Sequence, residues 1–178
     1  MNNIDPINSP MLSHIFCKPL KEQDPDFDYM SEVLSKKVIW WTAVDNPDGS
    51  LTFVKNKPDA KFFMTRITSF PKILEKMKSM YPEMVVETSY VTKCMPNYSM
   101  IPHVDANRST AIITPIGTNK GNLSFYLANK KVYTHVYTGP VLARISAMHS
   151  AENYSPDIRY SITIGMPGTY WQNYLKYK

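Results

Sequence analysis

Apolar residues recur at helical spacing in two short stretches of the N-terminal half, residues 27–36 and 71–81. The two apolar stripes consist of Phe27, Met30, Val33 and Leu34, and of Ile73, Leu74, Met77 and Tyr81. This spacing predicts two amphipathic helices. Pro71 suits the first turn of the second helix, which we expect to pack against a sheet.

Short runs of β-branched and aromatic residues alternate with turn clusters in the rest of the chain. Residues 38–44 predict a buried strand, residues 46–49 a turn, and residues 51–55 its hairpin partner. Beyond Pro82 the predicted strands are residues 84–92, 110–115, 123–127, 131–137, 141–145 and 159–165. This rhythm is typical of an antiparallel sandwich or jelly roll, so we expect a mostly β fold with flanking helices.

The 178 residues suit one domain, residues 1–178. Residues 1–25 are polar and rich in proline, which predicts an irregular lead-in. We expect residues 1–83 to form a helical and strand support, residues 84–168 the β core, and residues 169–178 a C-terminal tail.

Composition narrows the class of protein. With 43% hydrophobic and 20% charged residues, the chain is not collagen-like, coiled-coil or disordered. The net charge of +5 comes from 16 lysines and only 4 arginines. Nucleic-acid binders depend on arginine, so nucleic acid is a possible but unfavoured partner.

Two cysteines, Cys17 and Cys94, are too few for a disulfide framework. No signal-like or membrane-spanning segment is visible, so we expect a cytoplasmic protein that does not enter membranes.

A candidate metal site begins at His103-Val104-Asp105. On an extended strand, residues i and i+2 point to the same side, so an imidazole and a carboxylate can meet at one point. A second histidine, for which His149 is the candidate, would complete two imidazoles and one carboxylate. That set suits Fe(II) and leaves coordination positions open.

A candidate carboxylate receptor lies ten residues after His149, where Arg159 and Ser161 share one face of a predicted strand. A guanidinium and a hydroxyl side by side can bind a carboxylate. A buried arginine in a mostly apolar strand is costly unless an anion meets it.

The ordered set of these two motifs resembles the Fe(II)- and 2-oxoglutarate-dependent dioxygenases, especially small prolyl-hydroxylase-like members, some of them carried by phages. The resemblance covers residues 84–166. It implies a double-stranded β-helix, the jelly roll also found in cupins. It implies that His103, Asp105 and His149 bind Fe(II), and that Arg159 and Ser161 bind the distal carboxylate of 2-oxoglutarate. The co-substrates would be 2-oxoglutarate and O₂, and the products succinate, CO₂ and a hydroxylated substrate.

The chain departs from the family where relatives carry a tyrosine before the first histidine. Cys94 is near that place, and Tyr90 or Thr92 is a candidate substitute in the co-substrate pocket. Arg108 is a candidate contact for a carboxylate of co-substrate or substrate, or forms a structural pair. Tyr126 is a candidate for pointing toward the co-substrate, whereas Arg66 and Arg144 are interpreted as structural.

The resemblance leaves the substrate open. An amino-acid or peptidyl side chain is favoured, with a nucleobase or a small metabolite as alternatives. Two other classes stay possible: a non-redox, cupin-like metal-binding protein, and a catalytically silent interaction domain.

Overall fold

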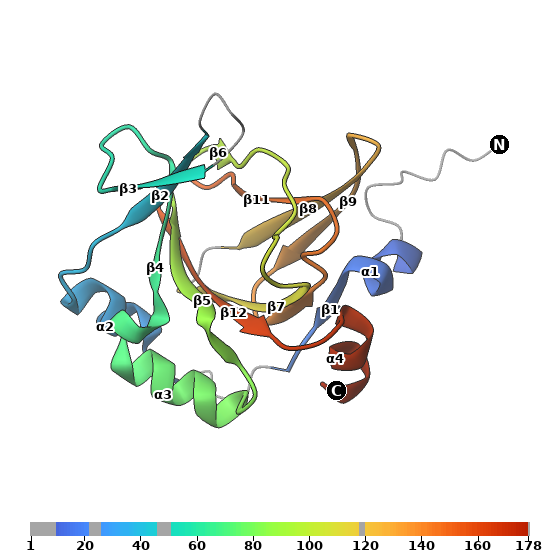
Figure 1. Cartoon of the computed structure of the whole chain (residues 1–178), viewed down its shortest axis with the longest axis horizontal. Coiled ribbons are helices and arrows are strands. Elements are labelled where there is room, and N and C mark those ends of the chain that lie inside the picture. The colour runs from blue at the N-terminus through green and yellow to red at the C-terminus, as the bar shows by residue number, and fades with distance from the viewer. Residues whose placement is uncertain (1–9, 22–25, 46–50, 118–119, 178) are drawn as a thin grey trace.

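Two antiparallel sheets face each other in the computed structural model, which describes residues 10–21, 26–45, 51–117 and 120–177 (Figure 1). The larger sheet has the strand order β1-β10-β7-β12-β5-β4-β2-β3, and the smaller has the order β6-β11-β8-β9. The strands are β1 (Cys17–Pro19), β2 (Trp41–Asp45), β3 (Leu51–Lys55), β4 (Phe62–Arg66), β5 (Val85–Cys94), β6 (Tyr98–Ser99), β7 (Thr110–Ile116), β8 (Gly121–Leu127), β9 (Lys130–Tyr137), β10 (Val141–Ala143), β11 (His149–Asn153) and β12 (Arg159–Met166). This arrangement confirms the predicted mostly β jelly roll.

The centre of the large sheet is formed by β7, β12 and β5. Every residue of β7 is buried, because side chains on both of its faces are covered. Ser161 of β12 pairs with Pro115 of β7 on one side and with Thr92 of β5 on the other. Since paired residues share a face, this register fixes which side chains of β5 and β12 point between the two sheets.

Helices cover the outer face of the large sheet. These are α2 (Tyr29–Ser35) and α3 (Pro71–Met80), with the 3₁₀ turn η2 (Ile67–Ser69) before α3. Glu32 of α2 accepts the backbone N–H groups of Lys72 and Ile73, at 3.0 and 2.7 Å. These N–H groups have no partner within α3, so Glu32 caps the helix and joins it to α2. Both helices agree with the predicted stripes.

The hydrophobic core has two parts. The first lies between the helices and the large sheet and contains Ile67, Phe70, Ile73, Met77, Val91, Ile112 and Ile162. The second lies between the two sheets and contains Phe16, Leu123, Phe125, Tyr133, Val141 and Ile145. The candidate site must therefore use the part of the inter-sheet space that this second core leaves free.

The chain ends are more regular than the sequence predicts. Within the described part of the expected irregular lead-in, residues 10–21, the chain forms α1 (Pro10–Phe16) and β1, and the expected tail forms α4 (Tyr170–Lys176). The ring of Phe16 stacks on Phe125, with centroids 4.6 Å apart. Thr169 and Gln172 form a capping box at the start of α4. Such short elements are held by tertiary packing and caps, which periodicity over a single turn does not reveal.

Two of the differences between the predicted and the observed strands concern the start of a strand and strands that were missed. The strand expected over 38–44 begins only at Trp41, and Ile39 is 48% exposed rather than buried. Strands β4, β6 and β11 were not predicted, because none of them shows a clear alternation of apolar and polar residues. The predicted turn at 46–49 lies outside the described residues. Along the described part of the chain, no helix has the length and apolar character needed to cross a membrane.

Candidate metal centre and carboxylate pocket

A single β-bridge brings the two candidate metal-binding histidines together. His149 is the first residue of β11, and His103 lies on the loop after β6. The backbone N–H of each histidine donates to the carbonyl oxygen of the other at 2.9 Å. The extended geometry predicted for His103 and Asp105 is thus limited to one bridge rather than a regular strand. The strand predicted over 141–145 is also shorter than expected, since β10 stops at Ala143.

The side chains of His103, Asp105 and His149 converge. Their ligand atoms all lie within 4.8 Å of one another. Nε2 of His103 is 3.6 Å from Oδ1 of Asp105, and the two imidazole centroids are 4.6 Å apart. Two imidazoles and one carboxylate on one side of a point form the donor set that leaves coordination positions open on Fe(II).

Backbone carbonyl groups orient both imidazoles. Nδ1 of His103 lies 2.9 Å from the oxygen of Ile101, and Nδ1 of His149 lies 2.9 Å from the oxygen of Ala147. A carbonyl oxygen only accepts, so each Nδ1 carries the proton. Each Nε2 is then left with its lone pair, as a metal ligand requires.

The protonation states and hydrogen bonds of the three candidate ligands favour binding of a cation. Burial, followed by the neighbouring His103, lowers the pKa of His149 to about 4. His149 is therefore neutral near pH 7. Nε of Arg108 donates to Oδ2 of Asp105 at 2.7 Å, and Nη1 of Arg108 donates to the oxygen of Thr88. Arg108 thus forms a structural pair that orients Asp105 and leaves its Oδ1 free.

Arg159 and Ser161 form a buried polar pocket that lacks partners. Both residues are only 2% exposed. Nη1 of Arg159 donates to the oxygen of Glu152, but Nε of Arg159 and Oγ of Ser161 have no hydrogen-bond partner among the described residues. No described acidic residue forms an ion pair with Arg159. Leaving a cation and a hydroxyl unsatisfied in the interior is costly. A bound carboxylate would satisfy both groups.

Tyr137 is a further polar side chain beside this pocket, and the sequence analysis missed it. Burial raises the pKa of Tyr137, while the nearby Arg159 and Ser161 oppose that rise. Gly121 gives the ring its room, because a Cβ at this position would lie 2.1 Å from Cζ of Tyr137. Alternation along 131–137 was the available signal, since it gives Tyr137 the same face as buried Tyr133.

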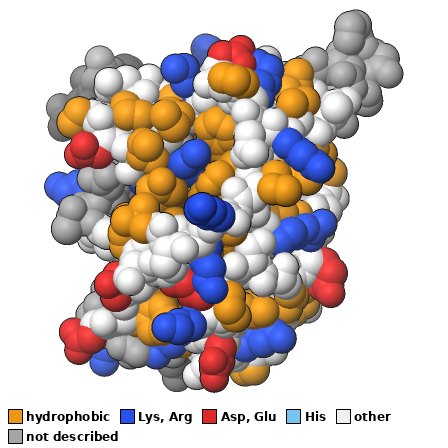
Figure 2. Space-filling model, turned by 90° about the vertical axis from the view of Figure 1, so that its left-hand side faces the viewer, with side chains coloured by type: hydrophobic (Ala, Val, Ile, Leu, Met, Phe, Trp, Pro, Cys, Tyr) orange, Lys and Arg blue, Asp and Glu red, His pale blue; other side chains and the backbone are white. Residues whose placement is uncertain are grey.

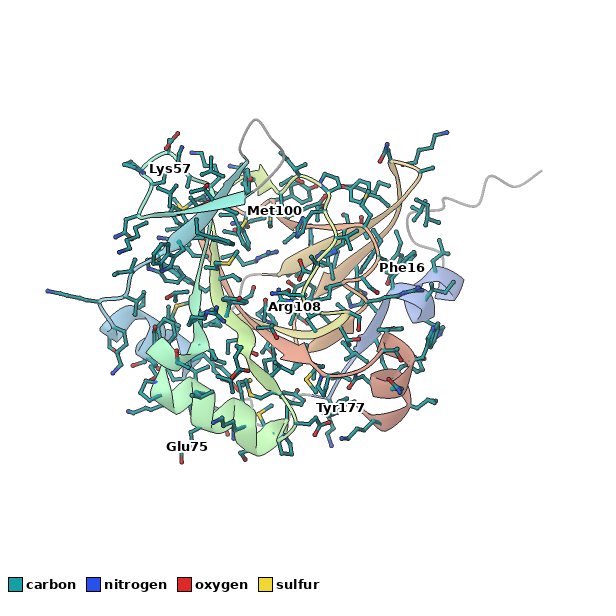
Figure 3. The ribbon with its side chains drawn as sticks, viewed as in Figure 1. Phe16, Lys57, Glu75, Met100, Arg108 and Tyr177 are labelled. Carbon is teal, nitrogen blue, oxygen red and sulfur yellow. The ribbon has the colours of Figure 1, made fainter. Side chains whose placement is uncertain are left out.

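A cavity of about 100 Å³ contains the three candidate metal ligands. Met100 and Arg108 border it, and Figure 3 shows Arg108 near the middle of the molecule and Met100 above it. Its other walls are Phe62, Met64, Tyr90, Thr92, Ile113, Leu123, Ile145, Ala151 and Thr163. Thr92 pairs in register with Ser161, so the cavity and the pocket of Arg159 are adjacent along the strands.

Tyr90 and Thr92 both line this cavity, but neither hydroxyl points to the pocket of Arg159. The hydroxyl of Thr92 donates to the backbone oxygen of Ser161 at 3.2 Å. The hydroxyl of Tyr90 donates to the oxygen of Glu87, and Tyr90 pairs with Thr163 rather than with Ser161. Of the tyrosines considered, Tyr137 is therefore the one beside the pocket.

The structure does not bring Tyr126 to the site. Tyr126 follows inward-facing Phe125, and its hydroxyl lies 3.2 Å from Oγ of Ser150 on the other face of the small sheet. On that face the buried Glu152 accepts hydrogen bonds from Lys131 and Ser124, at 2.6 and 2.8 Å. Burial alone would raise the pKa of Glu152, but these two hydrogen bonds outweigh it and lower the pKa.

Comparison with solved structures gives a likeness in fold at low sequence identity. A 2OG-Fe(II) oxygenase family oxidoreductase from Burkholderia pseudomallei has a TM-score of 0.52, with 9% identity over 76% of each chain. The Escherichia coli ribosomal oxygenase YcfD has a TM-score of 0.47 and 12% identity, over 94% of this chain but 46% of YcfD. A cupin domain from Bordetella pertussis has a TM-score of 0.36 and 13% identity, over 73% of this chain and 94% of the cupin. No protein-family profile and no curated protein sequence matches the chain.

Proposed function

We propose that this protein is an Fe(II)- and 2-oxoglutarate-dependent oxygenase. The observation that carries the proposal is the pocket of Arg159 and Ser161, which lies buried beside a His-Asp-His donor set and in which Nε of Arg159 and Oγ of Ser161 have no hydrogen-bond partner among the described residues. The donor set alone would suit many metal proteins. A buried receptor for a carboxylate, on the strand whose Thr163 lines the metal cavity, suits a co-substrate that has carboxylates at both of its ends.

Each residue has a distinct task in this proposal. His103, Asp105 and His149 would hold Fe(II), and Arg108 keeps Asp105 oriented through Oδ2. Arg159 and Ser161 would bind the distal carboxylate of 2-oxoglutarate, and we assign the third contact to Tyr137 rather than to Tyr90 or Thr92.

The bound iron and co-substrate would supply oxidation of a C–H bond by O₂, with release of succinate and CO₂. The chain would position the metal and the co-substrate and would keep water away from them. Apolar residues such as Ile113, Leu123 and Ala151 exclude water from one side of the cavity. The backbone bridge between His103 and His149 holds the donors in place before any ligand arrives. For the substrate, an amino-acid or peptidyl side chain remains our proposal.

The direct test is addition of Fe(II) and then 2-oxoglutarate without oxygen, followed by exposure to air. We expect a weak visible charge-transfer band when 2-oxoglutarate binds, and succinate after air is admitted. His103→Ala removes an imidazole ligand and should abolish the band, while an Arg144→Met control should retain it. Absence of the band and of succinate in the unmodified protein would refute the proposal. Metal binding without any effect of 2-oxoglutarate would indicate the cupin-like alternative.

A further inference from the structure

A second arginine borders the candidate site from the large sheet. Arg66 ends β4, where it pairs in register with Tyr90. Phe62 and Met64 of the same strand line the cavity, and residues two apart on a strand share a face. Arg66 therefore lies on the cavity side of β4. It is exposed, so it stands at the solvent end of this wall rather than in the interior.

The ring of Tyr90 has two guanidinium groups over it. Cζ of Arg66 is 5.1 Å from the ring centroid, and Cζ of Arg108 is 5.5 Å from it. Arg108 uses its Nε and Nη1 on Asp105 and Thr88. Arg66 makes no ion pair with any acidic residue that the structure describes. A purely structural interpretation of Arg66 therefore does not explain why its positive charge has no acidic partner among the described residues.

The charges around Tyr90 favour an anion. Two cations over one ring repel each other, and only Arg108 is neutralised, by Asp105. If Asp105 also binds Fe(II), its charge is shared with the metal and the region becomes more positive. Figure 2 shows Lys and Arg side chains scattered among apolar ones on the side of the molecule that carries β2–β4. The planar guanidinium of Arg66 presents paired donors that match a carboxylate or a phosphate.

We infer that the substrate of this site carries an anionic group, a carboxylate or a phosphate, that binds Arg66 over Tyr90 at the mouth of the cavity. The inference rests on the proposed function and adds a substrate class to it. A free amino acid would supply a carboxylate, and a nucleotide would supply a phosphate. The anion would direct the remainder of the molecule past Tyr90 toward the metal ligands, because Tyr90 lines the same cavity.

Arginine side-chain NMR tests this inference, because the chain has only four arginines and thus four guanidinium Nε–H signals. The protein is loaded with Zn(II), saturated with 2-oxoglutarate, and titrated separately with acetate and with inorganic phosphate. We expect a saturable shift of the Arg66 signal with at least one anion, while Arg144 stays unchanged. Arg66→Gln should weaken anion binding at least tenfold, and Lys78→Gln, an equal loss of charge on α3, should not.

The outcomes separate the inference from the proposed function. The 2-oxoglutarate step alone should move the Arg159 signal, and its failure would count against the proposed function. An Arg66 signal that moves no more than Arg144 would overturn the inference, even if Arg159 responds. In separate assays with Fe(II)-loaded protein exposed to air, succinate release should rise at least tenfold more with free L-amino acids than with their carboxamides, or with nucleoside monophosphates than with nucleosides. The responding pair identifies the source of the anion, and equal responses within both pairs would also overturn the inference.

Discussion

Arg159→Met removes the buried charge of the carboxylate pocket while keeping much of the side-chain volume. In the free protein this charge has one hydrogen bond, to the oxygen of Glu152, and no ion pair among the described residues. Losing that charge-assisted bond costs about 1.5–3 kcal/mol, and removing an unpaired buried charge offsets most of this cost. We therefore expect the free energy of unfolding of the ligand-free variant to lie within about 1 kcal/mol of that of the unmodified protein.

The response to 2-oxoglutarate should differ sharply between the two proteins. A ligand at 100 times its dissociation constant stabilises the folded state by about 2.7 kcal/mol. For a chain of this length, that corresponds to an increase in Tm of about 5–10 °C. We expect this increase in the metal-loaded unmodified protein and none in Arg159→Met, which lacks the cation that meets the distal carboxylate.

Thermal unfolding with and without 2-oxoglutarate measures both quantities. Arg144→Met is the matched control, because it makes the same chemical change outside the pocket and should keep the ligand-induced shift. Two results would refute the reasoning. One is a variant that still gains several degrees from 2-oxoglutarate. The other is a free variant destabilised by more than about 3 kcal/mol, which would mean that Arg159 is a structural group.

Three further predictions concern the surroundings of the site. Gly121→Ala places a Cβ 2.1 Å from Cζ of Tyr137, so isothermal titration should show about tenfold weaker 2-oxoglutarate binding, near 1.4 kcal/mol, with unchanged metal affinity. Asn153→Ala should lower the free energy of unfolding in urea by about 2–3 kcal/mol, because its amide nitrogen donates to the carbonyl oxygens of residues 94, 95 and 157. Glu152 has a lowered pKa, so its carboxylate stabilises the fold above the unfolded pKa of about 4.3 and loses this effect as the pH falls through the folded pKa. Glu152→Gln should therefore cost more stability at pH 7 than at pH 4, and an equal cost at both would contradict this.

The sequence predicts the β core well because its strands alternate and are separated by turn residues. The same alternation assigns His103 with Asp105, and Arg159 with Ser161, to shared faces. The structure places each pair together and brings His149 beside His103. Sequence spacing does not show how His103 is held in place, because His103 lies on a loop fixed by a single β-bridge rather than on a strand.

Other contacts of the site depend on tertiary packing, which alternation shows only in part, since it gives the face of Tyr137 but not the neighbours of its side chain. The position of Tyr137 depends on Gly121, which is its register partner across the β8–β9 hairpin. Arg66 gains its place at the cavity from β4, a strand whose pattern gave no signal. Tyr126 shows the reverse error. One residue along a strand changes the face, so its nearness to inward-facing Phe125 in sequence is misleading.

The bridge between His103 and His149 is formed by the main chain alone, with no side chain taking part. Any residue other than proline at these two positions can form the same bridge, so its side chain starts from the same place in the barrel. The side chains at these two positions can therefore be exchanged without changing the backbone that holds them. An engineer seeking a different metal preference could therefore vary positions 103 and 149 as a small combinatorial library, with the backbone as a constant template.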